Sequence, residues 1–402
     1  MKDLSGPDEP NPKAFLASIK DEKMPFSEAD SLAKELYGLV KVLGLEVVSQ
    51  EIVNVRGNQA KYGMGTGKAK ALAEKAASLE ADCIIFDIDI GPSRQRNWEE
   101  LAGIPVVDRQ GLIIQIFASR AQTREAVLQV SLAELVYALP RLRHKYIDLG
   151  RQRGGRYGTR GSGETRLETD RRRVEQRIHR LQEELEKLKM QRRLQRRQRE
   201  RSRVPVCALV GYTNAGKSSI LNALTGAGVL TEDKLFATLD STSRRLVLPG
   251  GMQVLLVDTV GFIRRLPHSL VNAFRSTLEE VSCADLLINV LDASEPDSDA
   301  MYSTTLSVLR ELDAGDIPMI TVLNKIDKVE SDKEKSGKEK SKEALLKQYP
   351  GSLPVSAVNG TGLAELCLRI EKTLASQRNL SFKEDRPETK HRRQAKGSFI
   401  YG

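Results

Sequence analysis

An apolar run followed by a glycine-rich loop is the feature that most constrains the fold of this chain. Residues 206–210 are all apolar, and residues 211–218 read GYTNAGKS immediately before a helix-forming stretch. Strand, glycine loop and helix in this order are typical of a phosphate loop, where backbone N–H groups and a helix N-terminus surround phosphate. The pattern can arise by chance, but its context makes a purely structural interpretation improbable. The residues predicted to bind phosphate are Gly211, Tyr212, Thr213, Asn214, Ala215, Gly216, Lys217, Ser218 and Ser219.

Two later segments are expected to complete a magnesium and γ-phosphate site. An apolar stretch at residues 254–257 ends in an aspartate and, three residues later, a glycine whose N–H can approach the γ-phosphate. Residues 235–240, between this stretch and the loop, contain Thr238, which is suited to close over magnesium, although Thr242 competes with it. These segments contribute Phe236, Ala237, Thr238, Leu239, Asp240, Asp258, Thr259, Val260 and Gly261. The predicted magnesium ligands are Ser218, Thr238 and Asp258, and the predicted catalytic residues are Lys217, Thr238 and Gly261.

A base-recognition element follows the apolar stretch at residues 320–323. The next four residues read NKID, and the carboxylate of Asp327 can accept both the ring N–H and the exocyclic amine of guanine. Adenine offers neither arrangement, so the site predicts selectivity for guanine. A second segment is expected to direct backbone N–H groups at the guanine carbonyl. The residues predicted for both elements are Asn324, Lys325, Ile326, Asp327, Ser356, Ala357 and Val358.

Four motifs in order, each at the end of an expected strand, predict a Ras-like P-loop GTPase domain with a doubly wound sheet at residues 204–377. In Ras-like enzymes a glutamine after the glycine of the second magnesium motif orients the attacking water. Phe262 stands at that place here, so we expect slow intrinsic hydrolysis that another component activates. Asn214 could help to hold a potassium ion against the phosphates, or it could stabilise the turn of its own loop.

The segments before residue 204 predict two further units. Alternating helix and strand patterns at residues 27–120 indicate a small parallel α/β domain, preceded by a flexible segment at residues 1–26. Inside this domain, residues 63–68 resemble a phosphate loop. Tyr62 replaces its first glycine and Ala69 replaces its magnesium-binding hydroxyl, so the resemblance fails.

Residues 121–203 are expected to form an antiparallel helical hairpin. Two apolar seams with heptad spacing flank residues 150–164, a glycine- and arginine-rich join predicted to be an irregular, mobile tip. The seam residues are Leu128, Leu132, Leu135, Leu139, Leu142, Val174, Ile178, Leu181, Leu185 and Leu188.

The positive charge of the chain is concentrated in this hairpin. Residues 141–203 contain 22 Lys and Arg against 9 Asp and Glu, a net +13 that exceeds the +9 of the whole chain. Such a one-sided excess favours a phosphate-backbone partner such as RNA, although a solvated coiled coil is the alternative. Residues 378–402 are predicted to be a disordered basic tail. The four cysteines lack disulfide or metal spacing and no window is long and apolar enough to span a bilayer, which predicts a soluble cytoplasmic protein.

Beyond these motifs, the chain resembles the HflX family of GTPases over about residues 45–375. The resemblance rests on GPSRQRN at residues 91–97, VDRQGLI at 107–113, GTRGSGET at 158–165, LETDRRR at 167–173 and LPHSLV at 266–271. Arg156, Tyr157 and Ser162 depart from the family pattern at the tip, which implies altered contact geometry there.

The resemblance implies a ribosome-associated GTPase that binds the large subunit, inserts its tip near ribosomal RNA and, in some members, splits stalled ribosomes under stress. The protein is further expected to be monomeric off the ribosome and to associate peripherally with membranes through ribosomes. Some members bind ATP through the first domain. An assembly factor for the large subunit, or an RNA clamp with a structural nucleotide, are the competing hypotheses. The residues expected to contact RNA are Arg151, Arg153, Arg156, Tyr157 and Arg160.

Overall fold

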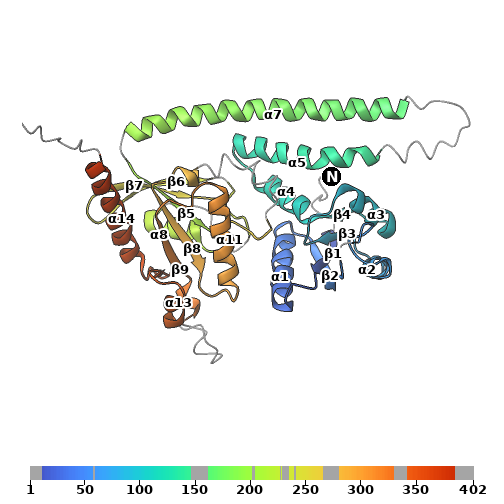
Figure 1. Cartoon of the computed structure of the whole chain (residues 1–402), viewed down its shortest axis with the longest axis horizontal. Coiled ribbons are helices and arrows are strands. Elements are labelled where there is room, and N and C mark those ends of the chain that lie inside the picture. The colour runs from blue at the N-terminus through green and yellow to red at the C-terminus, as the bar shows by residue number, and fades with distance from the viewer. Residues whose placement is uncertain are drawn as a thin grey trace, which may run out of the picture.

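The computed structural model places a small α/β domain and a larger α/β domain beside a long helical hairpin (Figure 1). It describes residues 11–57, 59–145, 162–201, 204–226, 228, 235–239, 241–265, 280–329 and 342–384. Within these ranges, no helix has the length and apolar character needed to cross a membrane.

The first domain is a four-stranded parallel sheet with helices on both faces. Its strands follow the order β2-β1-β3-β4, and separate apolar cores lie on the two faces. Helices α1 and α4 cover one face, and α2 and α3 cover the other. The elements are β1 (Lys13–Lys20), α1 (Phe26–Val42), β2 (Glu46–Asn54), α2 (Thr66–Ser78), β3 (Cys83–Phe86), α3 (Pro92–Ala102), β4 (Val106–Val107) and α4 (Arg109–Arg120). The predicted parallel α/β domain is thus present.

The first strand was not predicted. Residues 1–26 were expected to be flexible, yet β1 lies inside the sheet between β2 and β3, and Ala14, Phe15, Leu16 and Ala17 are fully buried. The expectation failed because a strand buried on both faces shows no polar alternation, and a run this short carries little periodic signal. The α/β domain therefore begins before residue 27.

Two antiparallel helices, α5 (Arg124–Lys145) and α7 (Ser162–Arg201), lie side by side and form the hairpin (Figure 1). The leucines of the two predicted seams are half-buried where their exposure is described, and Leu181 is fully buried. A second face of α5, with Ala126, Val130 and Ala133, packs into the core of the first domain. The hairpin is therefore anchored to that domain along α5.

The tip of the hairpin is only partly described. Helix α7 starts at Ser162, so residues 162–164 are helical although the sequence predicted an irregular join. The five predicted RNA-contacting residues lie outside the described residues.

The second α/β domain has a six-stranded sheet of order β10-β9-β8-β5-β7-β6, in which β6 alone is antiparallel to its neighbour. Its apolar cores lie on both faces, under α8 and α14 on one face and α11 on the other. The elements are β5 (Val206–Gly211), α8 (Lys217–Thr225), β6 (Thr242–Val247), β7 (Gln253–Asp258), β8 (Leu286–Asp292), α11 (Ser298–Glu311), β9 (Met319–Asn324), α13 (Lys342–Gln348), β10 (Leu353–Pro354) and α14 (Leu363–Glu384). This is the doubly wound arrangement that the motifs predicted.

Candidate nucleotide-binding site

The glycine loop connects β5 to α8 at the carboxyl edge of the sheet, where parallel α/β folds bind ligands. Two of its glycines are required by space and by backbone conformation. A Cβ on Gly211, whose φ is 138°, would lie 2.2 Å from the carbonyl oxygen of Val290. A Cβ on Gly216, whose φ is 92°, would lie 2.2 Å from Nδ2 of Asn324. The loop is therefore packed tightly between β8 and the base-recognition segment.

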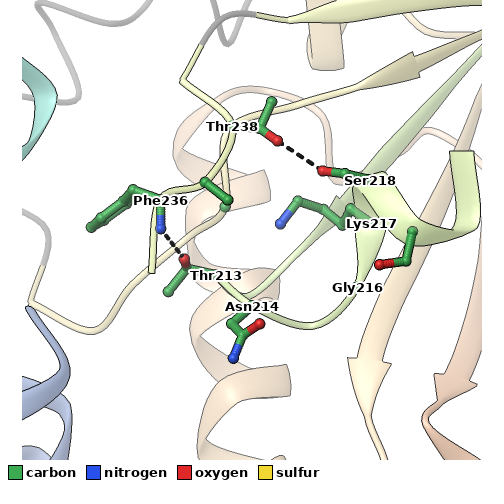
Figure 2. Close-up of a pocket in the computed structure, with 10 residues that line it drawn as sticks. Thr213, Asn214, Gly216, Lys217, Ser218, Phe236 and Thr238 are labelled. Atoms are coloured by element: carbon green, nitrogen blue, oxygen red, sulfur yellow. Dashed lines mark hydrogen bonds between the residues drawn. The ribbon is translucent and has the colours of Figure 1, made fainter. Parts of the chain in front are cut away.

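Lys217 begins α8 and points into the hollow of the loop (Figure 2). Its Nζ donates to the carbonyl oxygens of Gly211 at 3.4 Å and Tyr212 at 3.0 Å. Burial lowers the pKa of Lys217 to about 8, although the charge of Asp258 opposes this shift. A buried ammonium group inside a ring of backbone groups is suited to hold phosphate.

The three predicted magnesium ligands converge beside Lys217. The Ser218 hydroxyl donates to Oδ2 of Asp258 at 2.5 Å, and the Thr238 hydroxyl lies 2.7 Å from Ser218 and 3.2 Å from the same carboxylate oxygen. The other carboxylate oxygen of Asp258 is buried and accepts no hydrogen bond from the residues that the structure describes. Burial raises the pKa of Asp258, against the opposing effects of Lys217 and the two hydroxyls. Three hard oxygen donors with an unsatisfied carboxylate oxygen fit Mg²⁺.

The two threonines that the sequence left open are now distinguished by position. The hydroxyl of Thr238 lies at the Ser218 and Asp258 cluster, whereas Thr242 is the first residue of β6. The hydroxyl contacts of Thr238 make it the better candidate to close over magnesium. The role of Thr238 stays a prediction.

The segment after β7 packs directly against the glycine loop. The N–H of Thr213 donates to the carbonyl of Phe262 at 2.7 Å, and the N–H of Phe262 donates to the carbonyl of Gly211 at 3.1 Å. A Cβ on Gly261 would lie 2.5 Å from Cα of Thr213. The Phe262 side chain is buried with Val210 in the core on one face of the sheet. Gly261 thus brings backbone close to the phosphate site, and Phe262 offers no polar group there.

Several residues predicted to bind nucleotide direct their side chains elsewhere. Tyr212, Phe236, Leu239 and Val260 join the core shared with the first domain. The ring of Phe236 meets that of Phe117 edge-on, with centroids 4.8 Å apart, while its N–H donates to Thr213 Oγ1 at 2.7 Å. Only the backbone of Phe236 remains near the phosphate loop. Asp240 lies outside the described residues.

The base-recognition segments lie next to the glycine loop. Asn324 donates from Nδ2 to the carbonyl of Ala215 at 2.9 Å and accepts from the N–H of Ala357 at 3.2 Å. The hydroxyl of Ser356 donates to Oδ1 of Asp327 at 2.6 Å. One amide therefore joins the phosphate loop to both guanine-recognition segments. Of the remaining predicted members, Ile326 is buried beneath the site and the Val358 side chain is 88% exposed.

One member of this edge, Asp292, stands in none of the motifs predicted from the sequence. It ends β8 and pairs with Nζ of Lys325 at 2.7 Å, while Lys325 also donates to the carbonyl of Asn214 at 2.9 Å. Its place at the end of an apolar strand, level with the other motifs, is the signal that could have found it.

The cavity inside the loop has a volume of about 50 Å³. It is lined by Thr213, Asn214, Gly216, Lys217, Ser218, Ser219, Phe236, Ala237, Thr238 and Gly261.

The loop at residues 63–68 in the first domain has a different geometry. Nζ of Lys68 donates to the backbone carbonyl of Asn54 at the end of β2, so this lysine is bound to the protein itself. Lys68 is the third residue of α2, whereas Lys217 is the first residue of α8.

Comparison with known proteins decides the family. Residues 30–118 match the GTP-binding GTPase N-terminal family, residues 120–199 the GTP-binding GTPase middle region and residues 206–325 the 50S ribosome-binding GTPase family. A GTPase HflX of Akkermansia muciniphila is 45% identical over 362 residues, which cover 88% of this chain and 82% of that protein. The chain belongs to the HflX family of GTPases. GTPase HflX of Escherichia coli K12 is 40% identical, with 86% of this chain and 79% of that protein covered.

Among solved structures, a GTP-binding protein of Sulfolobus solfataricus in complex with GDP aligns with 91% of this chain and 99% of its own, at 26% identity and a TM-score of 0.45. Membership of the HflX family confirms the GTPase activity that the motifs predicted. The family model for its GTPase domain is that of ribosome-binding GTPases.

Proposed function

We propose that this GTPase docks on the large ribosomal subunit in its GTP-bound state and separates the subunits of ribosomes stalled under stress. One observation carries the proposal: a basic helical hairpin is fixed to the same body as the guanine-nucleotide site. Helix α5 packs on the first domain along one face and on α7 along another. The core under α5 also contains Tyr212 and Phe236 of the GTPase domain, so a conformational change at the nucleotide site has a packed route to a partner bound by the hairpin.

The charge of the hairpin supports RNA as the surface that it meets. Along α7, arginines such as Arg172 and Arg173 keep most of their side-chain area exposed, and they pair with Glu168 and Asp170 of the same helix. Exposed pairs of this kind contribute little to stability, so the arginines can exchange these partners for phosphate. The tip arginines, Arg151, Arg153, Arg156 and Arg160, add to this charge and are proposed with Tyr157 to contact ribosomal RNA.

For hydrolysis, we propose that Ser218, Thr238 and Asp258 hold Mg²⁺. When bound, the ion would neutralise negative charge on the β- and γ-phosphates. Lys217 holds the same phosphates through its ammonium group, and Gly261 directs its backbone N–H toward the γ-phosphate. Asp327 and the Ser356–Ala357 backbone fix the base at the far end. This assignment leaves no side chain to orient water at position 262, so the ribosome is proposed as the activator.

A potassium ion is proposed as a second cation beside Asn214. This residue lines the phosphate cavity and adopts a φ of 61°, in the left-handed region of backbone conformation. Hydrolysis measured at matched ionic strength should be faster in potassium chloride than in sodium chloride. Equal rates in the two salts would leave Asn214 with the role of stabilising its turn.

The docking proposal is tested by sedimentation of the full chain with ribosomes. The protein is expected to act in the cytoplasm. The full chain should move with large subunits in the presence of a non-hydrolysable GTP analogue and stay unbound with GDP. In a density gradient, GTP should shift intact ribosomes toward free subunits. A variant that lacks residues 154–163 should keep its GDP affinity and lose both effects.

The outcomes of this experiment separate the alternatives. Binding without any shift of intact ribosomes, together with accumulation of precursor particles on depletion, would favour an assembly factor. Ribosome binding that is the same with GTP analogue and GDP, and that survives Asp327→Ala, would favour an RNA clamp with a structural nucleotide.

A further inference from the structure

A cluster of three charged side chains and a tyrosine, all buried or largely buried, joins the first domain to the segment after β7. It consists of Glu35 in α1, Arg109 at the start of α4, Tyr212 in the phosphate loop and Arg264, and we call it the Glu35 cluster. One oxygen of the Glu35 carboxylate accepts from Nη2 of Arg109. The other accepts from the Tyr212 hydroxyl and from Nε of Arg264, the latter at 3.2 Å. Glu35 therefore holds one group from its own domain and two from the GTPase domain.

The cluster fixes the main chain of Arg264 as well as its side chain. The N–H of Arg264 donates to the hydroxyl of Tyr212 at 2.8 Å, and its carbonyl accepts from Nη2 of Arg109 at 2.8 Å. Its guanidinium donates to the hydroxyl of Ser31, in α1, at 2.7 Å. Both groups that hold this backbone are themselves bound to Glu35. The position of residue 264 is thus set by a carboxylate of the first domain.

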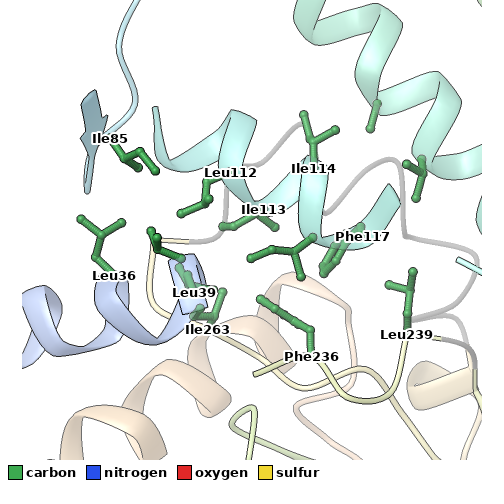
Figure 3. Packing of buried hydrophobic residues seen from close by; sticks show 14 of the residues in the cluster. Leu36, Leu39, Ile85, Leu112, Ile113, Ile114, Phe117, Phe236, Leu239 and Ile263 are labelled. Atoms are coloured by element: carbon green, nitrogen blue, oxygen red, sulfur yellow. The ribbon is translucent and has the colours of Figure 1, made fainter. Parts of the chain in front are cut away.

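Apolar packing supports the same segment around the cluster. Ile263, immediately before Arg264, is buried in the core that contains Leu39 of α1 and Phe117 of α4 (Figure 3). Phe236, from the segment that carries Thr238, lies in the same core. The segments that carry Thr238 and Gly261 therefore both pack on the first domain.

This anchoring matters because of what the segment contributes to catalysis. Phe262 is buried and cannot orient water, so the contribution left to residues 261–262 is the position of their backbone. Residue 264 lies three positions after Gly261, and Phe262 is bonded by its backbone to the phosphate loop on the other side. The chain from Gly261 to Arg264 is thus held at both ends. Displacement of a positioned group by about 1 Å can cost two orders of magnitude in rate.

We propose that Glu35 is a positioning residue for GTP hydrolysis, contributed by the first domain and acting through Tyr212 and Arg264 on the backbone at Gly261. It touches neither the phosphates nor the base. This role of Glu35 rests on the proposed approach of the Gly261 backbone to the γ-phosphate and does not depend on ribosome docking.

The test compares Glu35→Gln with Glu28→Gln in the full chain. Glu28 lies about two turns earlier on the same helix and is exposed, so it controls for the loss of one carboxylate from α1. Single-turnover GTP hydrolysis should be slowed about tenfold in Glu35→Gln and be unaltered in Glu28→Gln. Affinity for GDP, measured by titration, should stay within about twofold of the parent in both variants, because Lys217 and Asp327 retain their positions.

A second variant, Tyr212→Phe, keeps the ring in its apolar core and removes the hydroxyl that bonds Glu35 and Arg264. It should slow hydrolysis on its own, and the double variant should be no slower than the slower single one, because both act through Arg264. If Glu35→Gln does not fold, the single Tyr212→Phe comparison still decides the question. Hydrolysis that is unchanged or faster in Glu35→Gln would overturn the proposal. So would effects that multiply in the double variant, or a rate loss matched by an equal loss of GDP affinity.

Discussion

Substitution of Gly261 by alanine tests the geometry of the catalytic segment. The added Cβ would lie 2.5 Å from Cα of Thr213, which is backbone and cannot rotate away, and 2.9 Å from Nζ of Lys217. An ordinary van der Waals contact needs 3.4 Å or more. The segment must therefore retreat from the phosphate loop by about 1 Å, a displacement that can cost about 100-fold in rate, or about 2.7 kcal/mol of transition-state stabilisation.

The measurement is single-turnover hydrolysis of GTP by Gly261→Ala, alongside titration with GDP. The rate should fall about 100-fold. GDP lacks the γ-phosphate that Gly261 is proposed to approach, so its affinity should change by less than about threefold. The matched control is Gly67→Ala in α2, where an added Cβ meets no atom within 4 Å and the rate should be unaltered. A normal rate in Gly261→Ala would refute the reasoning, and an equal loss of GDP affinity would show that the damage is to the whole loop.

Three further predictions follow from single contacts. Burial lowers the pKa of Lys217 to about 8, and phosphate favours the charged form of this lysine. GTP affinity should therefore fall about tenfold between pH 7 and pH 9. Lys217→Arg, whose guanidinium does not titrate in this range, should not show this fall. Asp327→Asn replaces one acceptor by a donor, so GTP affinity should fall about 100-fold while xanthosine triphosphate binds better, as competition titration would reveal. Phe117→Ala removes a buried ring that packs on Phe236, so it should lower the free energy of unfolding, measured by denaturant titration, by about 3 kcal/mol. Its control, Val247→Ala, is at a 63% exposed position and should change the free energy of unfolding by less than about 0.5 kcal/mol.

The GTPase domain could be predicted from sequence because its chemistry is encoded locally. The phosphate loop needs glycines at 211 and 216 with a lysine directly after, and each requirement appears in a contiguous stretch. The order of the remaining motifs at strand ends then fixes where they meet. The structure brings Asp258, Asn324 and Ser356 to that same edge.

The contact between the two α/β domains could not be predicted in this way. The hydroxyl of Tyr212 bonds to Glu35, which lies 177 residues earlier, and neither residue stands in a pattern that indicates the other. Tyr212 and Phe236 were assigned to nucleotide because they lie inside motifs. Their aromatic side chains serve the domain interface, and only their backbones serve the loop. A motif specifies the main-chain path of a loop, while long-range packing decides where its variable side chains point.

The most direct test of the account is titration of the purified full chain with guanosine and adenosine triphosphates in the presence of magnesium. The two segments around Asp327 and Ser356 should make guanosine triphosphate bind at least about 100-fold more tightly than adenosine triphosphate. Lys217→Ala should abolish the binding of both nucleotides. Equal affinities for the two nucleotides would contradict the claim that one pocket holds phosphate at Lys217 and guanine at Asp327.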